Sequence, residues 1–254
     1  MVQPLTGLLG AIQFLTRVPV RTTSAVPHER TLPWFPSVGA LIGLVVGAVA
    51  AGLAEWIPVG VAAAVAVTAG LLLTGAFHED GLADIADAFG GGWTREQRLE
   101  ILKDSRHGTY GVGALCGSIV IRVVSAGSIV AQPALFAGFV AAHTLGRTAA
   151  ICALLVGRPA TQSGLGASAA SAGTRASIAI SSVLAIGAVT ALTGWWAVPL
   201  VGVSISGVTA VLWLSNRKVG GLTGDTLGAI EQVVECLVLV TVSGLALHHQ
   251  LWWS

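Results

Sequence analysis

Long apolar runs alternate with short polar segments along this sequence, and the runs predict helices that cross a membrane. Seven of them approach the ~20 residues that an α-helix needs to span the hydrocarbon core. They cover roughly residues 35–54, 57–77, 110–131, 133–156, 176–196, 197–215 and 226–252. A further apolar stretch, Leu5 to Val20, is shorter and ends among Arg17, Pro19 and Arg21. It predicts an interfacial or half-inserted helix before the first span.

Composition supports an all-α membrane bundle. Hydrophobic residues make up 54% of the chain and charged residues only 10%, whereas a soluble domain carries roughly 25% charged residues. A surface with so little charge must face lipid. The runs are rich in Gly, Ala and Ser, which let helix backbones approach closely. We therefore expect one polytopic integral-membrane domain over residues 1–254, with no length left for a second, soluble domain.

The basic residues are distributed asymmetrically between the predicted spans. Eleven of the 13 lysines and arginines fall on one side of a seven-span arrangement and none on the other. They are Arg17, Arg21, Arg30, Arg95, Arg98, Lys103, Arg106, Arg158, Arg175, Arg217 and Lys218. Because positively charged loops remain in the cytoplasm, we expect a cytoplasmic N-terminus and a multi-pass protein of the cytoplasmic (inner) membrane. Merging residues 176–215 into one span would break this pattern.

Charge and cysteine content exclude other classes of function. The net charge is +1 and the chain has no basic run, so a nucleic acid partner is not expected. Cys116, Cys152 and Cys236 all lie in apolar runs and form no CxxC pair. We expect buried free thiols there, not disulfides or zinc ligands.

The segment from Thr74 to Gly92, TGAFHEDGLADIADAFGGG, carries the first candidate site. At 100° per residue, Asp80, Asp84 and Asp87 share an arc of about 60° on one helix face. No Lys or Arg lies at nearby helical spacing, so the three carboxylates need a cation from elsewhere, and Mg²⁺ prefers such oxygen ligands. The alternative is a solvated polar face, although such faces ordinarily mix charge signs. His78 and Glu79 point elsewhere, as supporting or interfacial groups.

Two further segments combine glycines with charges on the same predicted side. Lys103 to Gly113 reads KDSRHGTYGVG, in which Lys103 and Arg106 could bind phosphate and Asp104 could be a metal ligand or a proton acceptor. The alternative is a positively charged flank followed by a turn.

Gly220 to Ala229 reads GGLTGDTLGA. A glycine-rich segment that opens a helix can bind phosphate, so Gly220, Gly221 and Gly224 are candidates for that role. Asp225 could add a metal ligand from a second helix. The alternative is a loop followed by an N-cap aspartate.

Four charged residues lie within the predicted spans, namely Arg122, Arg147, Glu231 and Glu235. Charges inside a membrane are costly and are normally paired or functional. Two interpretations stay open: interhelical ion pairs that hold the bundle together, or arginines that bind a phosphate or a bulky anionic substrate.

The segments HEDGLADIADAFGG, KDSRHGTYG and GGLTGDTLGA, with FLTRVPV at Phe14 to Val20, resemble the cobalamin synthase family. The resemblance implies a Mg²⁺-dependent transfer of the corrinoid phosphate of adenosylcobinamide-GDP to the ribose hydroxyl of α-ribazole or its 5′-phosphate, with release of GMP. It implies a catalytic membrane domain active on the cytoplasmic face. It is compatible with a homo-oligomer or with other cobalamin-assembly enzymes as partners.

We expect Asp80, Asp84, Asp87 and Asp225 to hold Mg²⁺, Asp84 and Asp104 to act in catalysis, and the phosphates to be bound by the remaining candidates. These are Lys103, Arg106, Arg147, Gly220, Gly221 and Gly224. The rival hypotheses are an enzyme similar to the CDP-alcohol phosphotransferases, with a lipid acceptor, and a transporter. A transporter is less favoured because the unusual residues gather at one edge of the membrane and not at its midplane.

Overall fold

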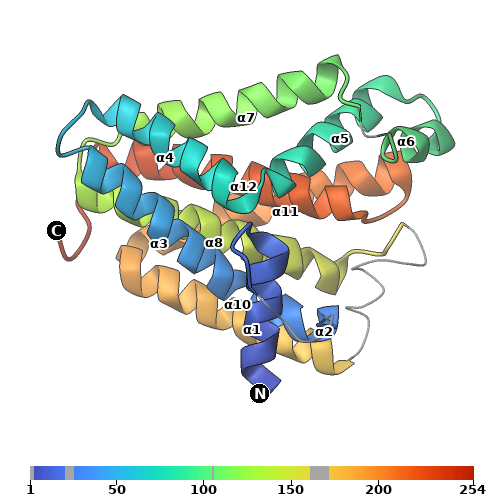
Figure 1. Cartoon of the computed structure of the whole chain (residues 1–254), viewed down its shortest axis with the longest axis horizontal. Helices are drawn as coiled ribbons and strands as arrows, with labels where there is room; N and C mark the ends of the chain where they lie inside the picture. The colour runs from blue at the N-terminus through green and yellow to red at the C-terminus, as the bar shows by residue number, and fades with distance from the viewer. Residues whose placement is uncertain (1–2, 21–25, 105, 161–171) are drawn as a thin grey trace.

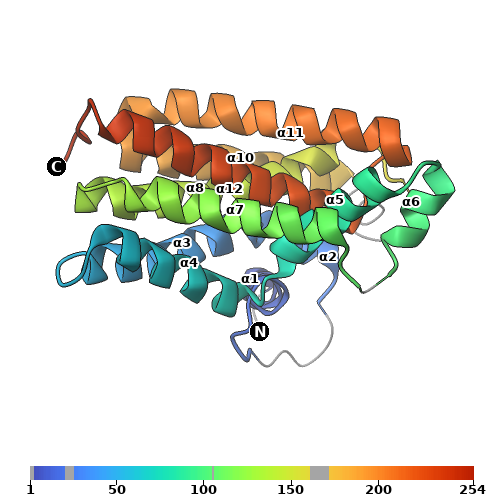
Figure 2. The same ribbon diagram turned by 90° about the horizontal axis from the view of Figure 1, so that it is seen from above.

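A computed structural model describes residues 3–20, 26–104, 106–160 and 172–254. This part of the chain is helical and contains no β-strand beyond one isolated bridge. Seven long helices lie side by side as a bundle (Figures 1 and 2): α3 Phe35–Leu53, α4 Val59–Thr74, α7 Thr109–Gly127, α8 Gln132–Val156, α10 Ala172–Thr193, α11 Ala197–Val219 and α12 Gly224–Ala246. The prediction of an all-α membrane bundle is confirmed.

The number of spans depends on how two regions are counted. Among the described residues, five stretches are long and apolar enough to cross a membrane, and a bent pair, α4 with α5 (Phe77–Gly91), makes six if it counts as one span. One of the five, Thr174–Val219, contains both α10 and α11. As a single helix its 46 residues would extend about 69 Å. The chain instead turns at the short helix η2, Gly194–Trp196, where Gly194 has a φ of +61°. The predicted count of seven is therefore approximate.

Glycines on α3 allow it to approach α8 closely. A Cβ at Gly39 would lie 2.5 Å from the carbonyl oxygen of His143, and one at Gly43 would lie 2.7 Å from Cα of Val140. In a bilayer such small residues favour helix association through backbone packing. Because α8 is buried along almost its whole length, this contact positions its polar side chains in the centre of the bundle.

The N-terminal helix α1, Gln3–Leu15, lies across the other helices (Figures 1 and 2). It is followed by α2, His28–Thr31, and the short helix η1, Leu32–Trp34. The apolar part of α1 is too short to count as a candidate span. This fits the predicted helix that does not cross the membrane.

A sharp bend separates α4 from α5. The two helices meet at 90°, and the bend consists of Gly75 and Ala76, both in the left-handed region with φ of +69° and +56°. Glycine adopts this conformation readily, whereas alanine rarely does. The bend directs α5 away from α4, so α5 runs towards one end of the bundle (Figure 1).

The polar connecting segments meet at that same end. On α6, Arg95–Ile101, Arg95 Nε donates to the carbonyl of Val219 at 2.9 Å and Arg98 donates to that of Lys218 at 3.1 Å. The backbone N–H of Leu222 donates to the carbonyl of Arg158 at 2.8 Å. The segments that follow α5, α8 and α11 are therefore neighbours, as the charge count predicted. Arg21 and most of the predicted 157–175 loop lie outside the described residues.

The three cysteines are free. Cys152 and Cys236 are partly buried, but Cys116 is exposed on α7. The prediction of a buried thiol is wrong for Cys116, because α7 lies at the edge of the bundle and an apolar run does not show which helix face points inward.

Candidate active site

Two carboxylates of α5 and one imidazole converge at the exposed end of the bundle. Asp80 Oδ1 lies 3.4 Å from His107 Nε2, and Asp84 Oδ1 lies 3.6 Å from His107 Nδ1. One ligand atom from each residue lies within 4.8 Å of the other two. We call these three residues the Asp80–Asp84–His107 group. Its geometry is that of a candidate site for a divalent cation.

The electrostatics of this group favour binding a cation. Burial, followed by the charges of Asp80 and Asp225, raises the pKa of Asp84 to about 6. Within the described residues no Lys or Arg forms an ion pair with Asp80 or Asp84. A divalent cation would supply the missing positive charge, and the two carboxylates are ligands that suit Mg²⁺.

His107 belongs to the KDSRHGTYGVG segment, but its part in the site was not predicted. It lies in the connection before α7, where helical periodicity does not apply. The available signal was chemical: a histidine between cationic residues and glycines, in a segment already expected beside the acidic helix.

Asp225 reaches the same region from the start of α12. That helix begins with a capping box, in which the Thr223 side chain accepts from the backbone N–H of Thr226. A Cβ at Gly81 of α5 would lie only 3.1 Å from the carbonyl oxygen of Asp225. The absence of a side chain at Gly81 therefore allows α5 to pack on the end of α12, with Asp225 beside the acidic pair.

Asp87 has a different environment from Asp80 and Asp84. Its carboxylate accepts hydrogen bonds from the backbone N–H of Gly108 at 2.6 Å and of Gly111 at 2.8 Å, and the side chain is buried. Any Cβ at Gly108 would lie 2.7 Å from this carboxylate. Asp87 thus caps the N-terminus of α7, where backbone donors and the helix dipole stabilise a negative charge. The structure does not bring it into the Asp80–Asp84–His107 group.

Two charged residues of the KDSRHGTYGVG segment, Asp104 and Arg106, pair with each other. The Arg106 guanidinium donates to Asp104 at 2.7 Å, and these hydrogen bonds lower the pKa of Asp104 to about 2. Such a carboxylate is a weak proton acceptor at neutral pH. Lys103 is exposed at the same surface.

The glycines of the third segment shape the turn between α11 and α12. Gly220 ends α11 with a φ of +83°, and Gly221 follows with +156°. A Cβ at Gly221 would collide with the carbonyl of Arg158. Gly224 begins α12 and has open space around it. The first two glycines are therefore explained by the backbone, whereas their predicted contact with phosphate stays a prediction.

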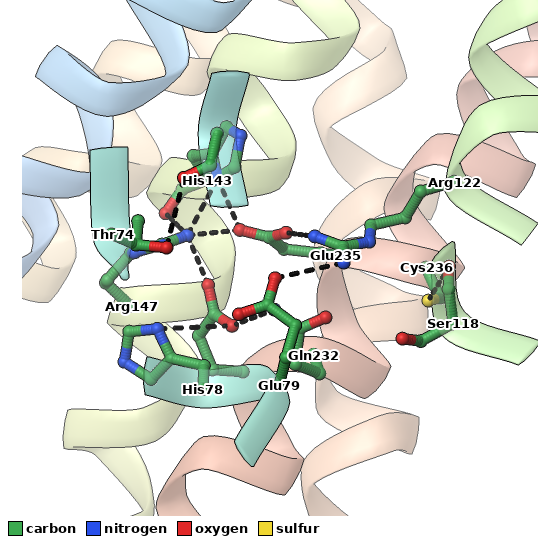
Figure 3. A network of polar contacts seen from close by, with 12 residues as sticks. Thr74, His78, Glu79, Ser118, Arg122, His143, Arg147, Gln232, Glu235 and Cys236 are labelled. Carbon is green, nitrogen blue, oxygen red and sulfur yellow. Dashed lines mark hydrogen bonds and ion pairs between the residues drawn. The ribbon is translucent and has the colours of Figure 1, made fainter. Parts of the chain in front are cut away.

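A second charged cluster lies inside the bundle (Figure 3). Arg122 of α7 lies 2.9 Å from Glu79 of α5 and 3.1 Å from Glu235 of α12. Arg147 of α8 pairs with both Glu231 and Glu235. We call these five residues, together with His78 and His143, the buried network.

The charged side chains of the buried network are shielded from solvent and paired with one another. None of its side chains is more than 7% exposed. Arg147, expected to bind phosphate, has its guanidinium between two glutamates, so the interhelical ion pair is the interpretation that the geometry supports. Glu79 and His78 point into this network. The sequence left both positions open, because a single helix does not show which neighbours surround it.

Comparison with known proteins extends this picture. The profile of the family described as Cobalamin-5-phosphate synthase matches residues 7–243. A protein of Azorhizobium caulinodans named adenosylcobinamide-GDP ribazoletransferase is 38% identical over 92% of this chain and 93% of its own length. Proteins of the same name from Shewanella piezotolerans and Ralstonia pickettii are 34% and 36% identical, over 95% and 92% of this chain and 97% and 93% of their own lengths.

No solved structure significantly matches the chain. The family match covers nearly all of it and includes the three segments that carry the resemblance in the sequence. The chain therefore belongs to the cobalamin-5-phosphate synthase family, a family of transferases in cobalamin biosynthesis.

Proposed function

We propose that this protein transfers the corrinoid-linked phosphate of adenosylcobinamide-GDP to the ribose hydroxyl of α-ribazole or α-ribazole 5′-phosphate. A ribose oxygen–phosphorus bond forms, the bond between the two phosphates breaks, and GMP leaves with that bridging oxygen. The hydroxyl proton passes to a base or to solvent. The main support for the proposal is that a member of this family brings Asp80, Asp84 and His107 together as a candidate metal site.

The donor set fits the Mg²⁺ that the family resemblance implies. Asp80 and Asp84 are the residues that would hold it, with Asp225 as a neighbour from α12. When bound, Mg²⁺ would neutralise charge on the diphosphate and on the departing GMP. The imidazole of His107 suits Mg²⁺ less well as a ligand than a carboxylate does. Its contacts with both carboxylates instead orient them.

The protein's own contribution is positioning and electrostatics, which carry most catalysis of phosphoryl transfer. Gly81 lets α5 pack on α12, so that Asp80 and Asp84 lie beside the start of that helix. Asp87 fixes α7, and through it His107, against α5. The hydrogen bonds from Arg106 lower the pKa of Asp104 to about 2, which makes its carboxylate a weak proton acceptor, so we do not assign it the role of general base.

The direct test uses purified protein in detergent with adenosylcobinamide-GDP, α-ribazole 5′-phosphate and Mg²⁺. We expect release of GMP together with formation of a cobalamin product, and loss of both when EDTA removes the metal. A parallel reaction with unphosphorylated α-ribazole identifies the preferred acceptor. If neither acceptor yields GMP, the proposed function is wrong.

The position of the site in the bundle also supports a proposal for the side of the membrane on which the reaction takes place. The polar connections and the Asp80–Asp84–His107 group share one end of the bundle with the basic residues. By the distribution of positive charge we propose that this end faces the cytoplasm, in the inner membrane of a bacterium. Reaction of a cysteine placed at Glu100 with a membrane-impermeant thiol reagent, in inside-out and right-side-out vesicles, tests this orientation.

A further inference from the structure

An open cleft of about 440 Å³ lies beside the Asp80–Asp84–His107 group. It is formed where α1 meets the bend between α4 and α5. Its lining includes Asp80 and His107 together with Arg17, Phe14 and Phe77. One cleft thus presents candidate metal ligands, a guanidinium and an aromatic wall.

The bend holds Arg17 in place in this cleft. The backbone N–H of Arg17 donates to the carbonyl of Leu73 at 2.7 Å, at the end of α4. A Cβ at Gly75 would lie 2.9 Å from the guanidinium carbon of Arg17. Gly75, already favoured by its φ of +69°, therefore also leaves room for the guanidinium to lie against the bend.

The charge of Arg17 is available to a ligand. Among the described residues no carboxylate forms an ion pair with Arg17, whereas Arg106, Arg122 and Arg147 are all paired. Asp80 lines the same cleft and does not pair with Arg17 either. The cleft is therefore lined by a carboxylate, Asp80, and a guanidinium, Arg17, that do not neutralise each other in an ion pair.

We propose that Arg17 binds a phosphate of the donor in this cleft, a step that rests on the proposed function. A diphosphate ester fits this cleft, because two oxygens of one phosphate can accept hydrogen bonds from the planar guanidinium. Asp80 and Asp84 would hold a cation that neutralises the other phosphate. The organic part of the ligand packs against Phe14 and Phe77. Arg17 thus takes the role that the sequence suggested for Arg106 and Arg147.

Equilibrium binding of adenosylcobinamide-GDP, without an acceptor, tests this proposal. The corrinoid absorbance reports the bound ligand after dialysis against the wild-type protein, Arg17→Gln, Arg17→Lys and Arg30→Gln in detergent with Mg²⁺. We expect about 10- to 100-fold weaker binding for Arg17→Gln, the effect of one lost charge-assisted hydrogen-bond pair, and a smaller loss for Arg17→Lys. Arg30→Gln removes an equal charge from the same N-terminal region, does not line the cleft, and should bind like wild type.

Turnover separates binding from general damage. Arg17→Gln should raise KM for the donor and leave KM for the acceptor unchanged, with a melting temperature equal to that of Arg30→Gln. Equal binding by Arg17→Gln and Arg30→Gln would overturn the proposal. So would a loss of acceptor affinity as large as that of donor affinity.

A second probe distinguishes failure of this proposal from failure of the proposed function. Titration calorimetry with Mg²⁺ and inorganic pyrophosphate measures the phosphate site independently of the corrinoid. If wild type does not turn over adenosylcobinamide-GDP but binds pyrophosphate more tightly than Arg17→Gln, the proposed function is wrong and the role of Arg17 stands. If pyrophosphate binding is equal in both proteins, the role of Arg17 is wrong.

Discussion

Glu79 and Asp80 are consecutive residues of α5, yet they lie in opposite environments. The Glu79 side chain is 4% exposed and pairs with Arg122, whereas the Asp80 side chain is 63% exposed and lies 3.4 Å from the imidazole of His107. A rotation of 100° between neighbouring positions separates them. One helix therefore contributes a carboxylate both to the buried network and to the Asp80–Asp84–His107 group.

The two charge clusters differ in whether their carboxylates are paired with Lys or Arg. The buried network contains its own cations, Arg122 and Arg147, so it is close to neutral without a ligand (Figure 3). The exposed group has carboxylates and no Lys or Arg paired to them among the described residues. Removing one partner from an internally balanced cluster leaves a buried charge without compensation, whereas an unbalanced cluster favours binding of a ligand of opposite charge.

Breaking the buried network should have the largest effect. Arg122→Ala leaves Glu79 and part of Glu235 buried without a partner, so we expect a loss of about 3 to 5 kcal/mol in the free energy of unfolding. Denaturant titration in detergent measures it, with the exposed Arg158→Ala as the control. The double variant Glu79→Leu with Arg122→Met should recover much of the loss. A single variant as stable as the control would contradict the structural role of the network.

Removing the charge of Asp84 should leave the fold intact and remove activity. Asp84→Asn eliminates one of two carboxylates that would hold the metal, so we expect kcat/KM for GMP release to fall at least about 100-fold. Glu100→Gln, on the exposed face of α6, provides a matched loss of one carboxylate. Without Mg²⁺ at neutral pH, the unfolding free energy of Asp84→Asn should be at least that of Glu100→Gln, because Asn lacks the charge that burial and neighbouring carboxylates disfavour at this position. Wild-type turnover by Asp84→Asn would exclude the metal site as described.

Asp87 should behave like the buried network and not like Asp84. Asp87→Ala removes the acceptor of two backbone N–H groups at the start of α7, which costs about 1 to 2 kcal/mol of unfolding free energy. The Mg²⁺ concentration for half-maximal activity should stay near the wild-type value, because the carboxylate faces Gly108 and Gly111. A larger shift in that concentration for Asp87→Asn than for Asp84→Glu would place Asp87 among the metal ligands after all.

The smallest effect concerns pH. Because the pKa of Asp84 is about 6 in the folded protein, above the ordinary value of 3.8, the folded state binds more protons than the unfolded state between these values. The metal-free protein should therefore lose stability as pH rises from about 4 to 6. Melting temperatures without Mg²⁺ test this, and Asp84→Asn should flatten the profile. Added Mg²⁺ should oppose the loss, because it binds the ionised carboxylate.

The sequence predicted the parts of this molecule that depend on local periodicity. Apolar runs gave helices at the predicted positions, and the charge count placed the polar segments at one end. The acidic row of α5 was also visible, because Asp80, Asp84 and Asp87 repeat at helical spacing. Helical spacing alone does not show which group each of these carboxylates contacts. Asp87 meets the start of α7 only because the intervening segment folds back.

The same limit applies to the residues predicted or proposed to bind phosphate. Arg147 has the right charge in the sequence, but its carboxylate partners Glu231 and Glu235 are set by the packing of α8 on α12. Arg106 instead pairs with Asp104, two residues away. Arg17 looked like the flank of an interfacial helix. Its place beside Asp80 depends on the 90° bend at Gly75 and Ala76, which no apolar periodicity indicates.

The carboxylates of α5 point in different directions around the helix. The rotation of α5 about its own axis therefore decides which neighbour each of them contacts. Substitutions alter one contact at a time: Glu79 to Arg122, Asp80 and Asp84 to His107, or Asp87 to Gly108. Inserting one residue after Ala76 would instead turn the whole helix by about 100° and advance it by about 1.5 Å. Every carboxylate would then face the wrong neighbour at once. Length changes in this family should therefore concentrate in the connections and avoid α5.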